Sequence, residues 1–172
     1  MCTGNICRSP IAERLASTMG SQLGIPRFEA VSAGTRALVG HPMHRHAATV
    51  LDELGGSGLG FAARRLTPRI VSRADLVLVM TREHRDVVLE CAPHKLHRTF
   101  TLVEAARLAS ECGAETVVDL AGVRPQLTAT DSFDIPDPIG QPLEVFATVG
   151  QLIADHLTPV LELCQRSVDS SE

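Results

Sequence analysis

The feature that most constrains the fold is an unbroken apolar run at residues 76–80, Leu-Val-Leu-Val-Met, which follows Asp75 and precedes Thr81. A run this short and this apolar suits a strand that is buried on both of its faces. Such strands are typical of parallel sheets that helices cover on both sides. The segment therefore predicts an α/β fold.

Amphipathic segments around this strand supply the helices. Ser9-Pro10 is typical of a helix start, with Ser as N-cap, and predicts a helix of about 12 to 14 residues. Apolar side chains repeat at helical spacing in residues 44–54 and, over the longest stretch, in residues 142–165. Thr81 is expected to cap another helix, which ends before Pro93. Alternating strands and helices place ligands at the carboxyl ends of the strands.

The remaining segments are assigned from turn residues and local composition. We expect strands at residues 28–33 and 95–100, helices at 67–72 and from Thr101, a surface connection at 113–130, and a proline-rich loop at 131–140. Together these elements predict a three-layer α/β sandwich with a central parallel sheet of about four strands flanked by helices. One domain is expected over residues 1–166, followed by a polar tail at 167–172.

Composition excludes several classes of protein. A net charge of -4 argues against a nucleic-acid-binding surface. No apolar run reaches the roughly 18 to 20 residues of a membrane span, and no signal peptide is recognisable, so we expect no membrane partner and a cytoplasmic location. Five scattered cysteines do not suggest a disulfide framework. Cys2 and Cys7 lack the spacing of zinc ligands, and we expect neither a metal nor a cofactor.

The N-terminal segment carries the most chemical information. It reads Cys2-Thr3-Gly4-Asn5-Ile6-Cys7-Arg8-Ser9 and leads directly into the first expected helix. Successive backbone N–H groups in such a loop can form a concave anion site, which the helix dipole reinforces. Arg8 adds a planar fork that matches two phosphate oxygens. The same positive field favours a cysteine thiolate, and Ser9 can donate a hydrogen bond to its sulfur.

This octapeptide resembles the signature of the low-molecular-weight protein tyrosine phosphatase family, which is Cys, five residues, Arg, then Ser or Thr. Three later segments and one dipeptide resemble the family's other landmarks in the same order: Val31-Ser32-Ala33-Gly34-Thr35, Ala63-Arg64-Arg65-Leu66-Thr67, Ala74-Asp75-Leu76-Val77-Leu78-Val79-Met80 and Asp137-Pro138. The resemblance covers nearly all of the chain.

The resemblance implies a two-step phosphatase reaction without a cofactor. Cys2 attacks phosphorus while Asp137 protonates the leaving oxygen, and Asp137 then serves as base when water hydrolyses the phosphocysteine. Arg8 clamps the phosphoryl oxygens, and inorganic phosphate is the product. The residues expected to bind the substrate are Thr3, Gly4, Asn5, Ile6, Cys7 and Ser9. The resemblance also implies a reversible disulfide between Cys7 and Cys2.

One departure concerns the start of the chain. The family has a strand of four or five apolar residues before its nucleophile, whereas only Met1 precedes Cys2. We therefore expect the first central strand to be missing or truncated, with Met1 an internal or mis-assigned start. A non-catalytic phosphate-binding module is the alternative that this departure favours.

A second departure concerns the substrate. Ile139-Gly140 follows Asp137-Pro138, where the tyrosine enzymes commonly carry aromatic residues, and this stretch resembles the Asp-Pro-Phe-Gly of the protein arginine phosphatases. The arginine phosphatases have Thr at the position of Ile6, whereas the tyrosine enzymes have Ile there, as this chain does. Phosphotyrosine on proteins is therefore the expected substrate and phosphoarginine the alternative. A thioredoxin-coupled arsenate reductase is less favoured, because Cys91 and Cys112 lie too far apart in sequence.

Three further expectations accompany this reading. The histidines at positions 41, 44 and 46 are expected to be surface or capping residues rather than metal ligands. Asp134 competes with Asp137 for the role of proton donor but lacks the following proline. The protein is expected to be a monomer or a weak dimer.

Overall fold

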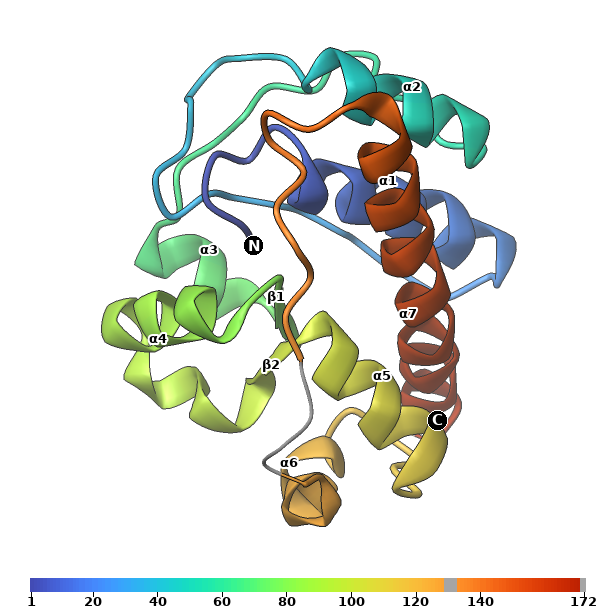
Figure 1. Cartoon of the computed structure of the whole chain (residues 1–172). Helices are drawn as coiled ribbons and strands as arrows, with labels where there is room; N and C mark the ends of the chain where they lie inside the picture. The colour runs from blue at the N-terminus through green and yellow to red at the C-terminus, as the bar shows by residue number, and fades with distance from the viewer. Residues whose placement is uncertain (129–132, 171–172) are drawn as a thin grey trace.

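The computed structural model describes residues 1–128 and 133–170. Its two regular strands, β1 (Val77–Val79) and β2 (Thr99–Thr101), are parallel neighbours, with Val77 opposite Thr99. They lie near the middle of the molecule, with helices on either side (Figure 1). The buried parallel strand predicted at residues 76–80 is therefore confirmed.

Parallel pairing continues beyond β1 through short segments. The amino group of Met1 donates to the Leu78 carbonyl (2.7 Å), and the Met80 N–H donates to the Met1 carbonyl (3.0 Å). Isolated parallel bridges then join Cys2 to Gly34 and Gly34 to Arg65. Cys2 consequently leaves the sheet at the same edge as the carboxyl end of β1.

The prediction of a strand at residues 28–33 is wrong, because the structure has no strand over those residues. The N–H of Ser32 donates to a carboxylate oxygen of Glu13 (2.8 Å) instead of to a neighbouring strand. Pairing begins only at Gly34, where a Cβ atom would lie 2.4 Å from the Thr3 carbonyl. Only glycine fits at that position.

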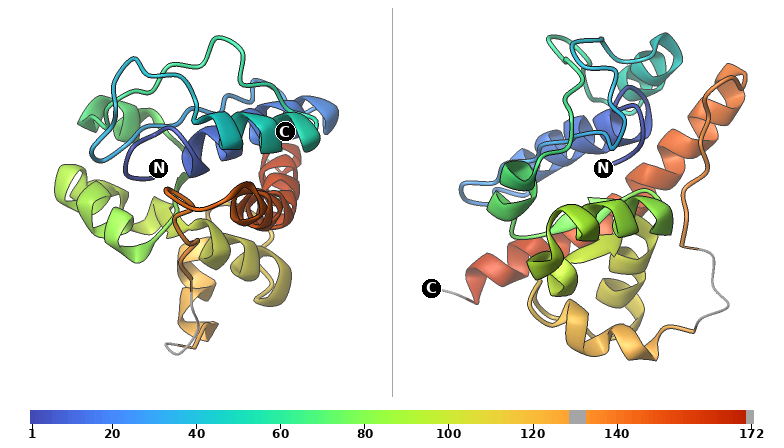
Figure 2. Two further views of the ribbon diagram at one scale, coloured as in Figure 1. Left: turned by 45° about the horizontal axis from the view of Figure 1, so that its top comes forward. Right: turned by 90° about the vertical axis from the view of Figure 1, so that its left-hand side faces the viewer.

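Helices cover both faces of the sheet, as two apolar clusters show. On one face Val77 and Val79 pack against Val71 of α3 (Pro68–Arg73) and Val88 of α4 (Arg82–Cys91). The larger cluster on the other face joins α1 (Arg8–Gln22), α5 (Leu102–Glu111) and α7 (Leu143–Asp169). Figure 2 shows α4 and α7 on opposite sides of the strands. The expected α/β architecture with flanking helices is confirmed, but the described residues form two regular strands and isolated bridges in place of the expected sheet of about four strands.

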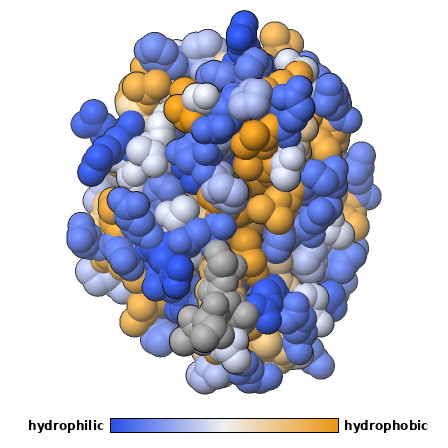
Figure 3. All heavy atoms as spheres, in the orientation of Figure 1, coloured by the Kyte–Doolittle hydropathy of each residue, from blue (hydrophilic) through white to orange (hydrophobic). Residues whose placement is uncertain are grey.

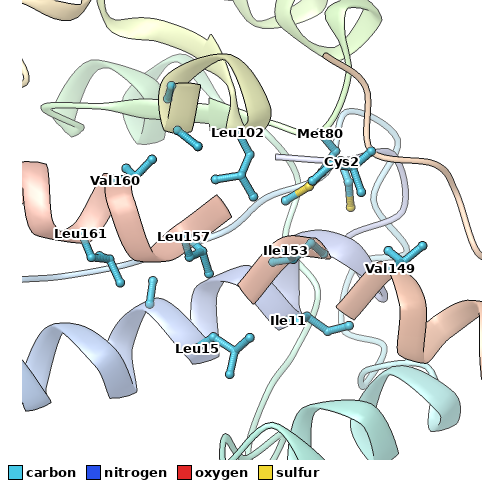
Figure 4. Close-up of a cluster of buried hydrophobic side chains, with 14 of the residues drawn as sticks. Cys2, Ile11, Leu15, Met80, Leu102, Val149, Ile153, Leu157, Val160 and Leu161 are labelled. Carbon is cyan, nitrogen blue, oxygen red and sulfur yellow. The ribbon is translucent and has the colours of Figure 1, made fainter. Parts of the chain in front are cut away.

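The larger cluster reaches the N-terminal loop. Ile11 of α1 and Ile153 of α7 are fully buried in it, together with Met80 at the end of β1. Cys2 belongs to the same cluster and appears beside these residues in Figure 4. The N-terminal loop is therefore anchored on the core of the protein.

The cap expected at Thr81 is confirmed, and three other expected helices also begin at a side-chain cap. His44 caps α2 (Arg45–Glu53), and Thr67 and Thr81 cap α3 and α4 with their side chains. Thr101 forms a reciprocal capping box with Glu104 at the start of α5.

Three expectations for the second half are corrected. Residues 93–98 form the 3-10 helix η1 (Pro93–Arg98), so only the end of the strand expected at 95–100 is extended. Pro93 favours this turn because its ring fixes φ at a helical value. The connection at 113–130 contains α6 (Leu120–Val123) and η2 (Arg124–Gln126). Helix α7 continues to Asp169, beyond the expected end at residue 165.

The loop expected at residues 131–140 lies partly outside the described residues. From residue 133 to residue 140 the backbone contains no helix or strand, as expected. None of the described helices is both long enough and apolar enough to cross a membrane.

Candidate active site

The loop between Cys2 and Arg8 is held from outside through its carbonyl groups. Four N–H groups donate to it: Thr35 to Cys2 (2.9 Å), Arg36 to Thr3 (3.0 Å), Leu38 to Gly4 (3.0 Å) and His44 to Ile6 (2.8 Å). Over the described part of the chain, the N–H groups of residues 3–7 donate to no protein acceptor. The loop thus presents a series of free donors at the N-terminus of α1, which is the arrangement that binds an anion.

Asn5 braces this loop from within. Its backbone is left-handed (φ 55°), a conformation that Asn adopts more readily than most residues. Its side chain is fully buried and donates to Ser9 Oγ (3.0 Å) and Ser32 Oγ (2.8 Å), while its Oδ1 accepts the Arg64 N–H (2.8 Å). The Asn5 side chain therefore supports the loop, and only its backbone N–H is left for a substrate.

The sulfur of Cys2 is buried 2.8 Å from Ser9 Oγ. Because Ser9 Oγ accepts a hydrogen from Asn5, its own hydrogen is available to the sulfur. Ser9 is therefore placed to donate a hydrogen bond to the Cys2 sulfur. The prediction that Ser9 caps the first helix is wrong, because α1 begins at Arg8 with Cys7 in the cap position.

A buried carboxylate completes this chain of hydrogen bonds. Glu13 Oε2 accepts both the N–H (2.8 Å) and the hydroxyl (2.5 Å) of Ser32. Its Oε1 lies 3.6 Å from the guanidinium of Arg64. Sequence analysis missed Glu13 and the role of Ser32. A charged residue among the buried positions of α1 is the signal that would have pointed to them.

Arg8 joins the loop to a distant part of the chain. Its buried guanidinium donates to the Ile135 carbonyl (2.9 Å) and to Asp137 Oδ2 (2.5 Å). The Asp137 side chain is 46% exposed, and its other oxygen accepts the Ile139 N–H (3.2 Å). The structure thus brings Asp137 and the N-terminal loop to one place, as the sequence predicted.

Asp134 has a different partner, although it lies only three positions away. Its Oδ1 accepts the N–H of Arg82 (2.8 Å) at the start of α4 and lies 3.6 Å from the Arg82 side chain. Of these two carboxylates, Asp137 is therefore the one that bonds the arginine of the loop.

The second cysteine of the loop differs chemically from the first. Burial and the neighbouring charge of Cys2 raise the pKa of Cys7 to about 12. Cys7 consequently stays a thiol near neutral pH and is a poor nucleophile. Both cysteines are free.

The histidines near the site are not arranged around a metal. His44 caps α2 and stacks on Phe146 with the ring centroids 4.8 Å apart, and His46 meets the same ring edge-on. Within residues 1–128 and 133–170, no group of three His, Cys, Asp or Glu side chains is placed to hold a metal ion.

A loop of free N–H donors, a buried cysteine and arginine, and an aspartate from a distant segment can be compared with known proteins. A family model described as low molecular weight phosphotyrosine protein phosphatase matches residues 1–170. The chain belongs to this family.

Individual members differ in how much of their length is matched. A low molecular weight protein-tyrosine-phosphatase, Etp of Escherichia coli K12, is 41% identical over 99 residues, which are 58% of this chain and 64% of Etp. The match therefore spans less than two thirds of that relative. The protein-arginine-phosphatase of Geobacillus stearothermophilus is 32% identical over 146 residues, covering 85% of this chain and 80% of the relative.

Solved structures extend the comparison to three dimensions. The low molecular weight protein tyrosine phosphatase of T. tengcongensis superposes with a TM-score of 0.75 at 29% identity and covers 94% of each chain. The fold assignment and the family thus agree over nearly the whole length of this phosphatase-family chain.

Proposed function

We propose that this chain hydrolyses phosphorylated proteins through a phosphocysteine formed at Cys2. The observation that carries this proposal is the Arg8 guanidinium, which bonds both the Ile135 carbonyl and Asp137 beside the loop of free N–H groups. Family membership supports a phosphatase reaction. Phosphate binding, attack and proton donation are thereby assigned to neighbouring groups.

In the first step the Cys2 thiolate attacks phosphorus in line with the leaving oxygen. The S–P bond forms as the P–O bond breaks, and Asp137 transfers its proton to the leaving oxygen. The N–H groups of residues 3–7 and the Arg8 fork stabilise the equatorial oxygens. This arrangement stabilises charge without a metal ion.

In the second step a water attacks the phosphocysteine. Asp137, now ionised, accepts a proton from that water, and the S–P bond breaks to release phosphate and the Cys2 thiolate. The hydroxyl of Ser9, 2.8 Å from the sulfur, stabilises the departing thiolate. One carboxyl group thereby serves both steps.

Phosphotyrosine is the substrate that we propose. Leu38, 47% exposed, belongs to the segment that holds the loop, and Ile139, 50% exposed, follows the acid by two positions. Such apolar side chains suit an aromatic ring better than a charged guanidinium. Figure 3 shows hydrophobic side chains gathered among hydrophilic ones on the face that carries the 133–142 segment. Phosphoarginine is the alternative, which the arginine phosphatase relative supports.

Parallel assays distinguish the two substrates. We expect hydrolysis of phosphotyrosine peptides and little turnover of phosphoarginine peptides by the unaltered chain. The Ile6→Thr variant should gain phosphoarginine turnover from that low starting value. Strong phosphoarginine turnover by the unaltered chain would instead assign it to the arginine branch.

Catalysis itself is tested with p-nitrophenyl phosphate. Cys2→Ser should abolish release of nitrophenol, whereas Cys91→Ser, a matched change outside the loop, should leave it intact. Turnover that survives in Cys2→Ser would place the reaction elsewhere.

We further propose that the enzyme acts in the cytoplasm, where a reducing environment keeps Cys2 and Cys7 as thiols. It is proposed to act as a monomer or a weak dimer. Sedimentation analysis over a range of concentrations tests that state, and a tight dimer at nanomolar concentration would contradict it.

A further inference from the structure

We propose that His84 is a positioning residue that ties the phosphate loop to the start of α4 through Thr3. The inference rests on the proposed function, since it concerns the same site. In this proposal residues 80–84, which include His84, contact both the loop of Cys2 and the segment of Asp137, and so set the distance between these two residues.

The contacts of the His84 ring fix it at both nitrogens. Its Nε2 lies 2.9 Å from Thr3 Oγ1, and its Nδ1 lies 2.7 Å from Thr81 Oγ1. The backbone N–H of His84 also donates to Thr81 Oγ1 (3.2 Å). The residue is 5% exposed, so these threonines replace water as its hydrogen-bonding partners. Thr3 directly follows the nucleophile, which places the contact at the first residue of the loop.

The protonation state of the ring determines the direction of these bonds. Burial and the positive charges of Arg8 and the Met1 amino group lower the pKa of His84 to about 4, against the opposing effect of Asp137 and Asp134. Near neutral pH the ring therefore has one donor and one acceptor nitrogen. Thr81 accepts the backbone N–H and donates its hydroxyl hydrogen to Nδ1. Nε2–H then donates to Thr3 Oγ1.

The same short segment holds the acid. The Met80 carbonyl accepts the Ile135 N–H (2.8 Å), and the Arg82 N–H donates to Asp134 (2.8 Å). Residues 80–84 therefore contact the phosphate loop on one side and the segment that carries Asp137 on the other. Both contacts therefore help to fix the position of the Asp137 segment relative to the loop that carries Arg8.

This arrangement has a kinetic consequence. Attack by sulfur and proton donation by Asp137 occur in one transition state, and misplacement of a reacting group by about 1 Å can reduce the rate about 100-fold. Loss of one of several positioning bonds should have a smaller effect, about tenfold. We expect it in kcat and also in the affinity for inorganic phosphate, because the Thr3 N–H belongs to the loop that binds the anion.

Two conservative substitutions separate the two nitrogens of the ring. His84→Gln keeps an amide donor near the position of Nε2, toward Thr3, whereas His84→Asn keeps a polar group only near Nδ1, toward Thr81. With p-nitrophenyl phosphate, His84→Asn should lower kcat about tenfold and His84→Gln less than about threefold. Equal losses in the two variants would overturn the proposal.

Thr3→Val tests the contact from the other side, because it removes the hydroxyl with little change in volume. Alone it should lower kcat about as much as His84→Asn does. The kcat of the double variant should lie within about twofold of the kcat of either single variant. If the loss of kcat in the double variant equalled the product of the two single losses, the two residues would act independently, and this would contradict the proposal. Nitrogen NMR of the folded protein should show His84 neutral with its hydrogen on Nε2; a hydrogen on Nδ1 would overturn the assigned direction.

Failure of this inference can be told apart from failure of the proposed function. If the unaltered chain does not turn over substrate, the proposed function fails, and calorimetric titration with inorganic phosphate replaces kinetics. His84→Asn should then weaken phosphate binding about tenfold while His84→Gln does not. Unchanged phosphate affinity in both variants would overturn the inference. If His84→Asn does not fold, the Thr3→Val measurement decides alone.

Discussion

Asp137 Oδ2 lies 2.5 Å from Arg8 Nη2, although the two residues are 129 positions apart in the chain. Arg8 is 4% exposed and Asp137 is 46% exposed, so the pair spans the boundary between the core and solvent. In the proposed mechanism the carboxyl group reaches the leaving group from the solvent side, and the guanidinium holds the phosphoryl group from within. The following predictions depend on this division of roles.

Replacement of the acid should slow the reaction according to the leaving group. Asp137→Asn should lower kcat about 10² to 10⁴-fold for phenyl phosphate, because phenolate leaves poorly without a proton. The loss should be smaller for p-nitrophenyl phosphate, whose leaving group needs less help. Asp134→Asn is the matched control and should remain within about threefold of the unaltered chain on both substrates, since Asp134 bonds α4. A larger loss of kcat in Asp134→Asn than in Asp137→Asn would mean that Asp134 is the proton donor.

Replacement of Asn5, whose side chain supports the loop between Cys2 and Arg8, should affect folding stability as well as activity. Asn5→Ala removes the buried side chain that bonds Ser9, Ser32 and the Arg64 N–H. The alanine must also adopt the left-handed backbone conformation of Asn5, which is strained for a residue with a Cβ atom. We expect a loss of about 2 to 4 kcal/mol in the free energy of unfolding. Asn5→Gly should lose less, because glycine adopts this φ without strain.

Urea unfolding of both Asn5 variants measures the difference. Equal stability of Asn5→Ala and the unaltered chain would contradict the described network.

Stability should depend on pH through His84. Its pKa is lowered to about 4 in the folded protein, from 6.5, so between these values the unfolded chain binds a proton that the folded protein does not. Unfolding is then favoured as pH falls, and full stability from this group is present only above pH 6.5. Between pH 7 and pH 5 the group should remove about 2 kcal/mol from the free energy of unfolding.

The His84→Gln variant isolates this contribution, because glutamine does not titrate. Urea unfolding of both proteins at pH 7 and pH 5 should show a smaller loss in the variant. An identical loss in the two proteins would mean that His84 titrates normally when folded.

Cys7 should resist alkylation. Burial and the charge of Cys2 raise its pKa to about 12, so the reactive thiolate form of Cys7 is scarce at pH 8. Iodoacetate carries a negative charge suited to the anion loop, and mass spectrometry should find it on Cys2 but not on Cys7. Saturating inorganic phosphate should protect Cys2. Rapid modification of Cys7 in the folded protein would contradict this picture.

Several parts of the fold and of the site could be predicted from the local sequence. The loop from Cys2 to Ser9 and the caps at Thr67, Thr81 and Thr101 depend on neighbouring residues, so motif and spacing suffice to predict them. The run at residues 76–80 is apolar on both faces, and this predicts its place between two helical layers.

Other parts depend on contacts between distant segments. Residues 28–33 have strand-like composition, yet Glu13 takes the Ser32 N–H away from the sheet. His84 lies in the first turn of α4, and nothing in its sequence neighbourhood indicates that it meets Thr3, 81 positions away. Such pairs form only once the fold brings the elements together.

The central claim is that Cys2 carries the phosphoryl group between the two steps. The most direct test mixes the unaltered chain with p-nitrophenyl phosphate, quenches it in acid during steady turnover, and maps phosphorylated peptides by mass spectrometry. We expect one phosphoryl group on Cys2 and none in Cys2→Ser. Turnover without a phosphorylated Cys2, or a phosphoryl group on another residue, would contradict the account.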